Sequence, residues 1–465
     1  MQGLRALELQ LRRDLRLIAY PEIDWVPLRR GPDGAPVLDV LVVGAGQGGL
    51  ATLFGLRRER VNRILAIDRA PAGGEGPWLG YARMKTLRSW KTVTGPDLDL
   101  ACLTYQAWHE AQWGEEDFAR LDKIAKENWH GYLQWYRRVL ELPVENGTTL
   151  TGIEPAESSR FLRARIERKA GAQFLHARKI VLAHGIESSG AWWMPAALGR
   201  LAAHLRAHAA DEIDFSRLAG RRVAVIGAGA SAFDNAAAAL EAGAAEVRLY
   251  CRRERLQRVQ PYKYLSFNGF FRHFRELDDA WRWRFMNYLL TVREALPKET
   301  WERCTRNARF FLHEGMPWLD AREEGSGVVG VTPRGEVRAD FAIAGTGFEM
   351  DLAARPELAG FAQEIATWGD RYSPPQGEEN ERLARYPYLG PDFELIEKVP
   401  GRAPWLRNVR VFTFGATASF GPSGSSINAM KFSAPRIVAG LTRDFFCEDA
   451  AAFYDGLKGY ATPEF

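Results

Sequence analysis

The stretch VLDVLVVGAGQGGLATLFGLRRERVNRILAIDRA, residues 37–70, decides the fold of this chain. An apolar run typical of a buried strand leads into Gly44, Gly46 and Gly49, and a helical pattern follows. In this GxGxxG arrangement the first glycine permits a tight turn, the second admits a pyrophosphate, and the third lets helix and strand pack closely. We therefore predict that the turn binds a dinucleotide, with the phosphates at the positive end of the helix dipole. A purely structural glycine turn is the alternative.

The strand that follows this helix ends in an acidic residue. Asp68 stands 24 residues after Gly44, and Arg69 comes directly behind it. A carboxylate at this place can accept hydrogen bonds from both ribose hydroxyls of an adenosine that carries no 2′-phosphate. The first unit therefore suits FAD or NAD, and we expect Asp68 and Arg69 in its cofactor site.

A second unit of the same kind is RRVAVIGAGASAFDNAAAALEAGAAEVRLYCRR, residues 221–253. Its turn repeats the spacing with Gly227 and Gly229, then Ser231, and Ala232 in the third glycine place. We predict a second dinucleotide site here, built from these four residues.

The end of the second unit differs in charge from the end of the first. The same offset of 24 residues leads to Cys251, and Arg252 and Arg253 follow it. A carboxylate would repel a 2′-phosphate, whereas two guanidinium groups can bind one. This favours NADPH in the second unit, and the other interpretation is that both arginines are solvated charges at a strand end.

A weak internal repeat indicates how the two units are connected. HARKIVLAHG at 176–185 aligns without gaps with RADFAIAGTG at 338–347, each a strand that ends in a small residue, one variable position and Gly. We predict an α/β fold with two Rossmann-like domains, the NADPH domain inserted into a discontinuous FAD domain. The expected segments are a helical arm at 1–36, the FAD domain at 37–200 and 336–465, and the NADPH domain at 215–335.

Composition and charge exclude several classes of protein. Hydrophobic residues make up 46% and charged residues 26%, which is ordinary for a globular protein. The net charge of 62 − 58, or +4, is too small to indicate nucleic acid or an anionic membrane as a partner. No apolar run is long enough to span a bilayer. The four cysteines lie too far apart for a redox pair, a zinc knuckle or a disulfide scaffold: Cys102, Cys251, Cys304 and Cys447. We expect a cytoplasmic protein with no metal site.

The first 18 residues have helical spacing, with leucines on one face. We expect this arm to dock on the main body. A membrane-surface helix is the alternative, and the arm is also a possible contact in a homodimer.

An acidic and a basic dinucleotide site in one chain indicate two redox cofactors. FAD with NADPH is the simplest pair, with hydride passing from nicotinamide to flavin. Disulfide reduction would need a dithiol beside the flavin, which the cysteine positions exclude, so the electrons must leave to oxygen or another acceptor.

With these features the sequence resembles the class B flavoprotein monooxygenases, which include flavin-containing monooxygenases, N-hydroxylating amine hydroxylases and Baeyer–Villiger enzymes. The resemblance covers about residues 37–440. It rests on VVGAGQGGL, GPW at 76–78 with Trp78, LAHG at 182–185, VAVIGAGASAFD, and AGTGF at 344–348. It implies that NADPH reduces FAD, that oxygen adds to the flavin as a C4a-hydroperoxide, and that a nucleophilic nitrogen or sulfur of a small molecule takes one oxygen atom.

Two family features are altered here. The family places a histidine before its second glycine turn, and His208 stands 19 residues before Gly227, with His204 as the alternative. Two surface histidines on an Ala-rich helix are the competing interpretation. Flavin-containing monooxygenases also carry an asparagine after the tryptophan motif, where this chain has Ser89 and Trp90.

Three residues are candidates for catalytic roles at the flavin ring. Ser89 and Lys91 follow the tryptophan motif, in a loop expected to pass the isoalloxazine. Asn428 begins a helix after the loop SFGPSGSS, whose N–H groups could face the flavin pyrimidine. A solvated lysine and a plain capping loop are the alternatives.

The sequence thus predicts an FAD- and NADPH-dependent monooxygenase that uses O2. Baeyer–Villiger oxygenation of a ketone and a reductase or oxidase that releases hydrogen peroxide are the alternatives, and a redox-sensing protein without turnover is a third class.

Overall fold

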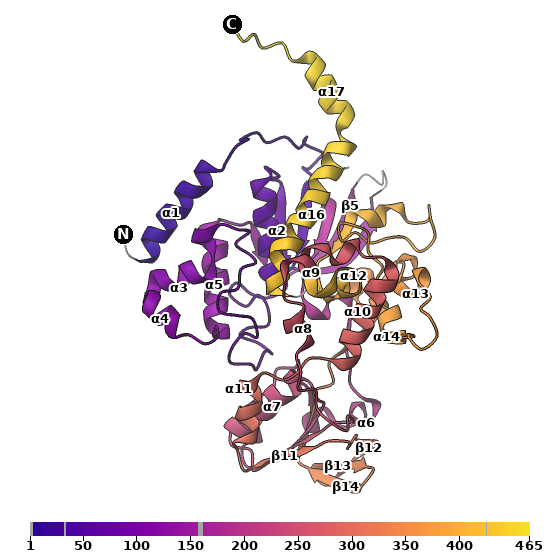
Figure 1. Ribbon diagram of the computed structural model, residues 1–465. Helices are drawn as coiled ribbons and strands as arrows, with labels where there is room; N and C mark the ends of the chain where they lie inside the picture. Colours follow the sequence, from indigo (N-terminus) through magenta and orange to yellow (C-terminus); the bar gives the residue numbers. More distant parts are fainter. Residues whose placement is uncertain (1–2, 32–33, 157–160, 425) are drawn as a thin grey trace.

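The computed structural model describes residues 3–31, 34–156, 161–424 and 426–465 of the chain. Figure 1 shows a larger lobe, in which both ends of the chain lie, and a smaller lobe that contains β11–β14 and α7. Each lobe is built around its own sheet with parallel central strands, as two dinucleotide-binding units require.

The first sheet lies in the larger lobe and contains the first glycine motif. Its strand order is β3-β2-β1-β6-β5-β4, and β17 also pairs with β6. β1 runs parallel to β2 and β6, while β4, β5 and the start of β6 form an antiparallel extension. The bounds are β1 Leu38–Val43, β2 Ile64–Asp68, β3 Val144–Asn146, β4 Thr149–Pro155, β5 Leu162–Arg168, β6 Gly171–Leu182 and β17 Val409–Val411.

Two helices lie against each other beside this sheet. Residues Val40–Val43 of β1 are all buried, and α2 (Gln47–Arg58) follows them directly. α2 packs closely on α16 (Ile427–Glu448), because a Cβ added at Gly55 would lie 2.9 Å from Val438 Cγ2. α16 therefore completes the core of the first lobe.

The second sheet is parallel throughout and has the order β11-β10-β9-β15-β8. Helices α7 (Ala230–Glu241) and α11 (Lys298–Thr305) pack on it and on each other. A small antiparallel sheet of β12, β13 and β14 is attached. The bounds are β8 Arg206–His208, β9 Arg222–Ile226, β10 Glu246–Tyr250, β11 Phe310–His313, β12 Asp320–Glu324, β13 Gly327–Thr332, β14 Gly335–Ala339 and β15 Phe341–Ala344.

The second domain is inserted into the first, as the sequence predicts. The chain leaves the first sheet after β6 and returns after β15, and the crossings pair as β7 (Gly190–Trp192) and β16 (Phe348–Met350). The expected boundaries at 215 and 335 differ from this arrangement. β8 and β15 lie outside those limits, yet both pair within the second sheet, so that sheet extends from 206 to 344.

Part of the predicted NADPH segment packs away from its own sheet. Helices α8 (Pro261–Tyr264), α9 (Asn268–His273) and α10 (Asp279–Val292) share a core with residues from 368–388 of the larger lobe. Figure 1 shows α8–α10 beside the larger lobe, not on the second sheet. This segment therefore forms one wall between the two lobes.

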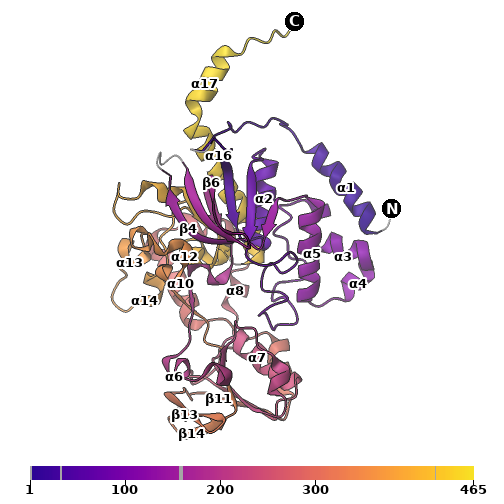
Figure 2. The same ribbon diagram turned by 180° about the vertical axis from the view of Figure 1, so that it is seen from behind.

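The N-terminal helix α1 (Leu4–Leu17) docks on the body, as predicted. Leu11 is fully buried, and Glu8 accepts hydrogen bonds from Trp135 Nε1 at 3.1 Å and Arg138 Nη2 at 2.7 Å. Figure 2 shows α1 beside α3 and α5, and α17 projecting away from the body at the C-terminal end of α16. No helix in the described part of the chain is long and apolar enough to cross a membrane. The remaining helices are α3 Tyr105–Trp113, α4 Glu115–Arg120, α5 Lys126–Val139, α6 Ala196–Gly199, α12 Pro356–Ala359, α13 Trp368–Arg371, α14 Glu381–Ala384, α15 Thr417–Phe420 and α17 Ala450–Gly459.

Candidate active site

One large cavity of about 1520 Å³ runs between the lobes, and both glycine turns open into it. It has the position in which two dinucleotides would meet, at the carboxyl ends of two parallel sheets. The predicted cofactor residues that line it are Gly44, Gly46, Asp68, Arg69, Trp78, Gly227, Gly229, Ser231, Arg252 and Arg253.

The glycines of the first turn have different structural roles. Gly44 has φ +101°, and a Cβ there would lie 2.7 Å from the Ala183 carbonyl oxygen. A Cβ at Gly49 would lie only 1.9 Å from the Gly44 carbonyl oxygen. A Cβ at Gly46 would meet nothing within 4 Å, although Gly46 lines the cavity at the N-terminus of α2. The open space at Gly46 therefore fits the pyrophosphate of FAD.

Asp68, at the end of the next strand, forms hydrogen bonds that hold the first glycine turn in place. Its Oδ2 accepts a hydrogen bond from the Ala45 N–H and its Oδ1 from the Ala70 N–H, both at 2.8 Å. Each carboxylate oxygen can accept a second hydrogen bond, so Asp68 keeps capacity for a ribose hydroxyl. The acidic end predicted from the sequence thus both shapes the turn and faces the cavity.

The second turn reproduces this geometry with one exchange of residues. A Cβ at Gly229 would meet nothing within 4 Å, as at Gly46. Ala232 occupies the third glycine place and faces Gly345, which has no side chain. A Cβ added at Gly345 would lie only 2.5 Å from the Ala232 Cβ. Gly345, which directly follows β15, therefore leaves the space that the Ala232 side chain of α7 occupies.

The two predicted phosphate arginines have different surroundings. Arg253 donates hydrogen bonds to the carbonyl oxygens of Thr291 at 2.7 Å and Val292 at 3.0 Å, so it caps the C-terminal end of α10. Arg252 is exposed to the cavity and makes no hydrogen bond or ion pair with the described residues. Arg252 is therefore the freer of the two guanidinium groups, and Arg253 also lines the cavity.

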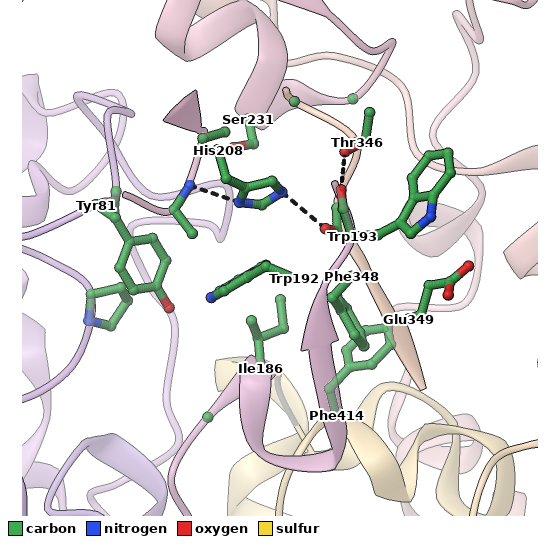
Figure 3. A pocket seen from close by; sticks show the side chains of 18 of the residues that line it. Tyr81, Ile186, Trp192, Trp193, His208, Ser231, Thr346, Phe348, Glu349 and Phe414 are labelled. Carbon is green, nitrogen blue, oxygen red and sulfur yellow. Dashed lines mark hydrogen bonds between the residues drawn. The ribbon is translucent and has the colours of Figure 1, made fainter. Parts of the chain in front are cut away.

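His208 connects the two lobes at the hinge. Its Nδ1 accepts the Ala210 N–H at 3.1 Å, and its Nε2–H donates to the Gly347 carbonyl oxygen at 3.0 Å. Burial lowers the pKa of His208, which keeps the ring neutral, and the ring of Trp192 lies 5.2 Å away (Figure 3). His208 ends a strand and is buried, so the interpretation as a surface histidine on an Ala-rich helix is wrong.

Aromatic side chains from four separate segments line the cavity near His208 (Figure 3). The ring of Trp192 lies 5.7 Å from Tyr81 and 6.2 Å from Phe348, and Phe348 lies 4.9 Å from Phe414. We call these four residues the aromatic wall. No sequence motif pointed to it, because its members are far apart in the chain and meet only at the domain interface.

A second histidine, in the first returning turn, is held by an acid. His184 Nε2 lies 2.7 Å from Glu357 Oε1, and both residues line the cavity. Burial alone would raise the pKa of Glu357, but the His184 hydrogen bond and the Arg355 charge outweigh it and lower the pKa to about 2. Glu357 is therefore ionised and fixes the orientation of His184.

The three candidate catalytic residues do not line this cavity. Lys91 Nζ donates to the carbonyl oxygens of Phe118 and Ala119, each at 2.9 Å, and so fastens its loop to α4. Among the described residues, Arg88 lines the cavity where Ser89 and Lys91 do not. Met430 does so from the helix that carries Asn428. The structure therefore does not bring Lys91, Ser89 and Asn428 together with the cofactor turns.

The fold and this cavity define a flavoprotein of the two-dinucleotide type, and comparisons with known proteins agree. The family model "Pyridine nucleotide-disulphide oxidoreductase" matches residues 38–264. The FAD-dependent urate hydroxylase of Xanthomonas campestris pv. campestris is 41% identical over 464 residues, covering 100% of this chain and 97% of the relative. The FAD-binding monooxygenase VdtE of Byssochlamys spectabilis is 31% identical over 202 residues, 42% of this chain and 32% of its own length.

Solved structures show the same fold at low identity. The ornithine N-hydroxylase of Kutzneria sp. 744 has a TM-score of 0.68 and 16% identity, covering 88% of this chain and 100% of that protein. The L-lysine 6-monooxygenase of Pseudomonas syringae has a TM-score of 0.65 and 19% identity, with 87% and 99% coverage. The chain belongs to the family of FAD-dependent hydroxylases that includes the Xanthomonas relative, and its fold is that of the class B flavin monooxygenases. It is an oxidoreductase, as predicted.

Proposed function

We propose that this enzyme is an FAD- and NADPH-dependent monooxygenase that transfers one oxygen atom of O2 to urate or a closely similar oxopurine. The balanced reaction takes substrate, O2, NADPH and a proton to hydroxylated substrate, NADP⁺ and water. The observation that carries the proposal is 41% identity to a urate hydroxylase over the full length of the chain. The sequence-based expectation of an amine or thioether substrate therefore gives way to an oxopurine as the first candidate.

The cavity supports this proposal through its two open glycine turns. The space at Gly46 would hold the FAD pyrophosphate, and Asp68 would accept the ribose hydroxyls of the same cofactor. Bound there, FAD supplies the activation of molecular oxygen. The matching space at Gly229 would hold the pyrophosphate of NADPH, with Arg252 available to its 2′-phosphate.

The aromatic wall supports a flat substrate. Tyr81, Trp192, Phe348 and Phe414 present ring faces and edges to the cavity at van der Waals spacing from one another. Such rings pack well on a planar heterocycle and exclude water from the place of oxygen transfer. A flexible aliphatic amine would use little of this surface.

The test is turnover of the FAD-loaded protein with NADPH, O2 and a panel of urate, ornithine, lysine, a thioether and a ketone. We expect one urate consumed for each NADPH oxidised, with little hydrogen peroxide. Loss of ornithine or lysine in place of urate would show N-oxygenation, and loss of the ketone would show Baeyer–Villiger chemistry. Equal NADPH oxidation with every compound, with all oxygen recovered as hydrogen peroxide, would show an oxidase.

A further inference from the structure

Two arginines on one wall of the cavity have no role in the function proposed so far. Arg293 follows the last residue of α10, and Arg382 lies on α14, and both line the cavity. Arg382 Nη2 lies 3.3 Å from the Phe348 carbonyl oxygen, so its guanidinium stands beside the aromatic wall. The guanidinium of Arg293 makes no hydrogen bond or ion pair with the described residues.

The charges around Arg293 leave this wall positive. Burial lowers the pKa of Arg293, and the positive charges of Arg382 and Arg253 lower it further. The largest effects in the opposite direction come from two phenols, Tyr386 and Tyr262. A cluster of guanidinium groups that form no ion pair with an acid is a binding environment for an anion.

The nearby acids do not neutralise the pair. Glu294 follows Arg293 in the chain, but its Oε2 lies 2.5 Å from Arg88 Nη1. Glu349 follows Phe348 on β16 and also lines the cavity (Figure 3), but it forms no ion pair with either arginine among the described residues. Neither Arg293 nor Arg382 is therefore paired with a carboxylate in the part of the chain that the structure describes.

The backbone at Arg293 gives an independent indication. Arg293 has φ +67° and ψ 178°, a backbone conformation that is almost confined to glycine. A long charged side chain is present here in spite of that preference. The Arg293 guanidinium therefore places a positive charge in the cavity wall at the end of α10.

The same wall carries the rings that would hold a flat substrate. Phe414 lies 4.9 Å from Phe348 and 6.2 Å from Tyr386. A planar molecule that packs on these rings would present its edge to the two guanidinium groups. Guanidinium is planar and can donate two parallel hydrogen bonds to an oxyanion or a deprotonated ring edge.

We propose that Arg293 and Arg382 form an anion-recognition subsite that binds the ionised edge of the substrate and makes the enzyme specific for anionic planar heterocycles. This inference rests on the proposed function and names the residues that select its substrate. Under this proposal Arg293 and Arg382 bind the substrate, whereas Arg252 binds the nicotinamide cofactor.

The experiment measures equilibrium binding to the oxidised, FAD-loaded protein by calorimetry. The ligands are urate, which is anionic at pH 8, hypoxanthine as a flat and largely neutral purine, and benzoate as an unrelated flat anion. The variants are Arg382→Gln and Arg293→Gln. Arg284→Gln is the matched control, because Arg284 lies on α10 in an exposed ion pair with Glu378 and does not line the cavity.

We expect each of the two variants to weaken urate and benzoate binding by about tenfold or more, with hypoxanthine binding changed less than about threefold. The control variant should match the wild-type protein, and all variants should retain FAD and their thermal unfolding midpoint. Unchanged urate and benzoate affinity would overturn the subsite. A raised KM for NADPH in flavin reduction, in place of weaker urate binding, would also overturn it and assign the pair to the cofactor.

Failure of the proposed function gives a different pattern. A wild-type protein that neither binds nor consumes urate would reject urate as the substrate. Loss of benzoate binding in Arg382→Gln would then still support the anion subsite, whereas wild-type benzoate binding in both variants would reject it.

Discussion

Substitution of Gly46 by valine separates cofactor binding from folding. Gly46 has φ −72° and ψ −172°, which any residue adopts, and an added Cβ meets nothing within 4 Å. A larger residue there lowers the entropy of the unfolded chain, which stabilises by about 0.4–1 kcal/mol, and weakens the N-cap of α2 by a similar amount. We therefore expect the free energy of unfolding of the FAD-free Gly46→Val protein to stay within about 1 kcal/mol of wild type.

The effect on FAD should be much larger. The valine side chain would occupy the space that fits the pyrophosphate and separate it from the N–H groups of α2. Two charge-assisted hydrogen bonds of about 1.5–3 kcal/mol each would be lost, which corresponds to a factor of about 10² to 10⁴ in Kd. Purified Gly46→Val protein should be colourless, and flavin fluorescence titration should show the weakened binding.

Two further variants control this reasoning. Gly229→Val has equal space in the second turn, so it should retain FAD and lose rapid reduction by NADPH. Gly44→Val should not fold, because Gly44 has φ +101° and its Cβ would lie 2.7 Å from backbone atoms of Ala183 and His184. A yellow Gly46→Val protein with wild-type FAD affinity would refute the assignment, and so would unfolding of this variant as severe as that of Gly44→Val.

Three other predictions concern the second turn and the base of the first sheet. Gly345→Ala should lower the free energy of unfolding by about 1–3 kcal/mol, because the new Cβ would lie 2.5 Å from the Ala232 Cβ. In a double-mutant cycle, Ala232→Gly should restore part of this loss. Simple additivity of the two changes would contradict the prediction. Arg252→Gln should raise the KM for NADPH about tenfold or more with little change for NADH, measured by stopped-flow flavin reduction, and an unchanged ratio would exclude the phosphate contact. Burial raises the pKa of Asp39 to about 6 despite Arg63, so the folded chain binds this proton more tightly than the unfolded chain. The resulting stability is present below about pH 4 and is lost as the pH rises through about 6, by up to about 3 kcal/mol. Urea unfolding of Asp39→Asn should lack this loss, and equal pH profiles for both proteins would contradict it.

The cofactor turns could be predicted from the sequence because their physics is local. The spacing of Gly44, Gly46 and Gly49 between a strand and a helix fixes the turn, and the acidic end at Asp68 follows one strand later. The aligned segments 176–185 and 338–347 also predicted the returning strands, which the structure shows as β6 and β15. Insertion of one domain into the other follows from that repeat.

The substrate end of the cavity could not be predicted, because it depends on how the lobes meet. Tyr81, Trp192, Phe348 and Phe414 are ordinary aromatic residues in four distant segments. Their contacts require the antiparallel pairing of β7 with β16 at the hinge. Single-sequence reasoning contains no signal for that pairing.

Two predicted site residues have partners that the sequence does not reveal. Arg253 follows the strand where a phosphate arginine is expected and lines the cavity, and two carbonyl oxygens at the end of α10 also accept hydrogen bonds from its guanidinium. Lys91 follows the tryptophan motif, but the nearby carbonyl oxygens at the end of α4 take its ammonium group. His208 could be recognised by its distance from Gly227, whereas its partner Gly347 could not.

The most direct test of the account is turnover under ¹⁸O2 with FAD-loaded enzyme, NADPH and urate, followed by mass spectrometry of the product. We predict one labelled oxygen atom in each product molecule and one product for each NADPH oxidised. An unlabelled product, or complete recovery of the label as hydrogen peroxide with urate intact, would contradict the central claim.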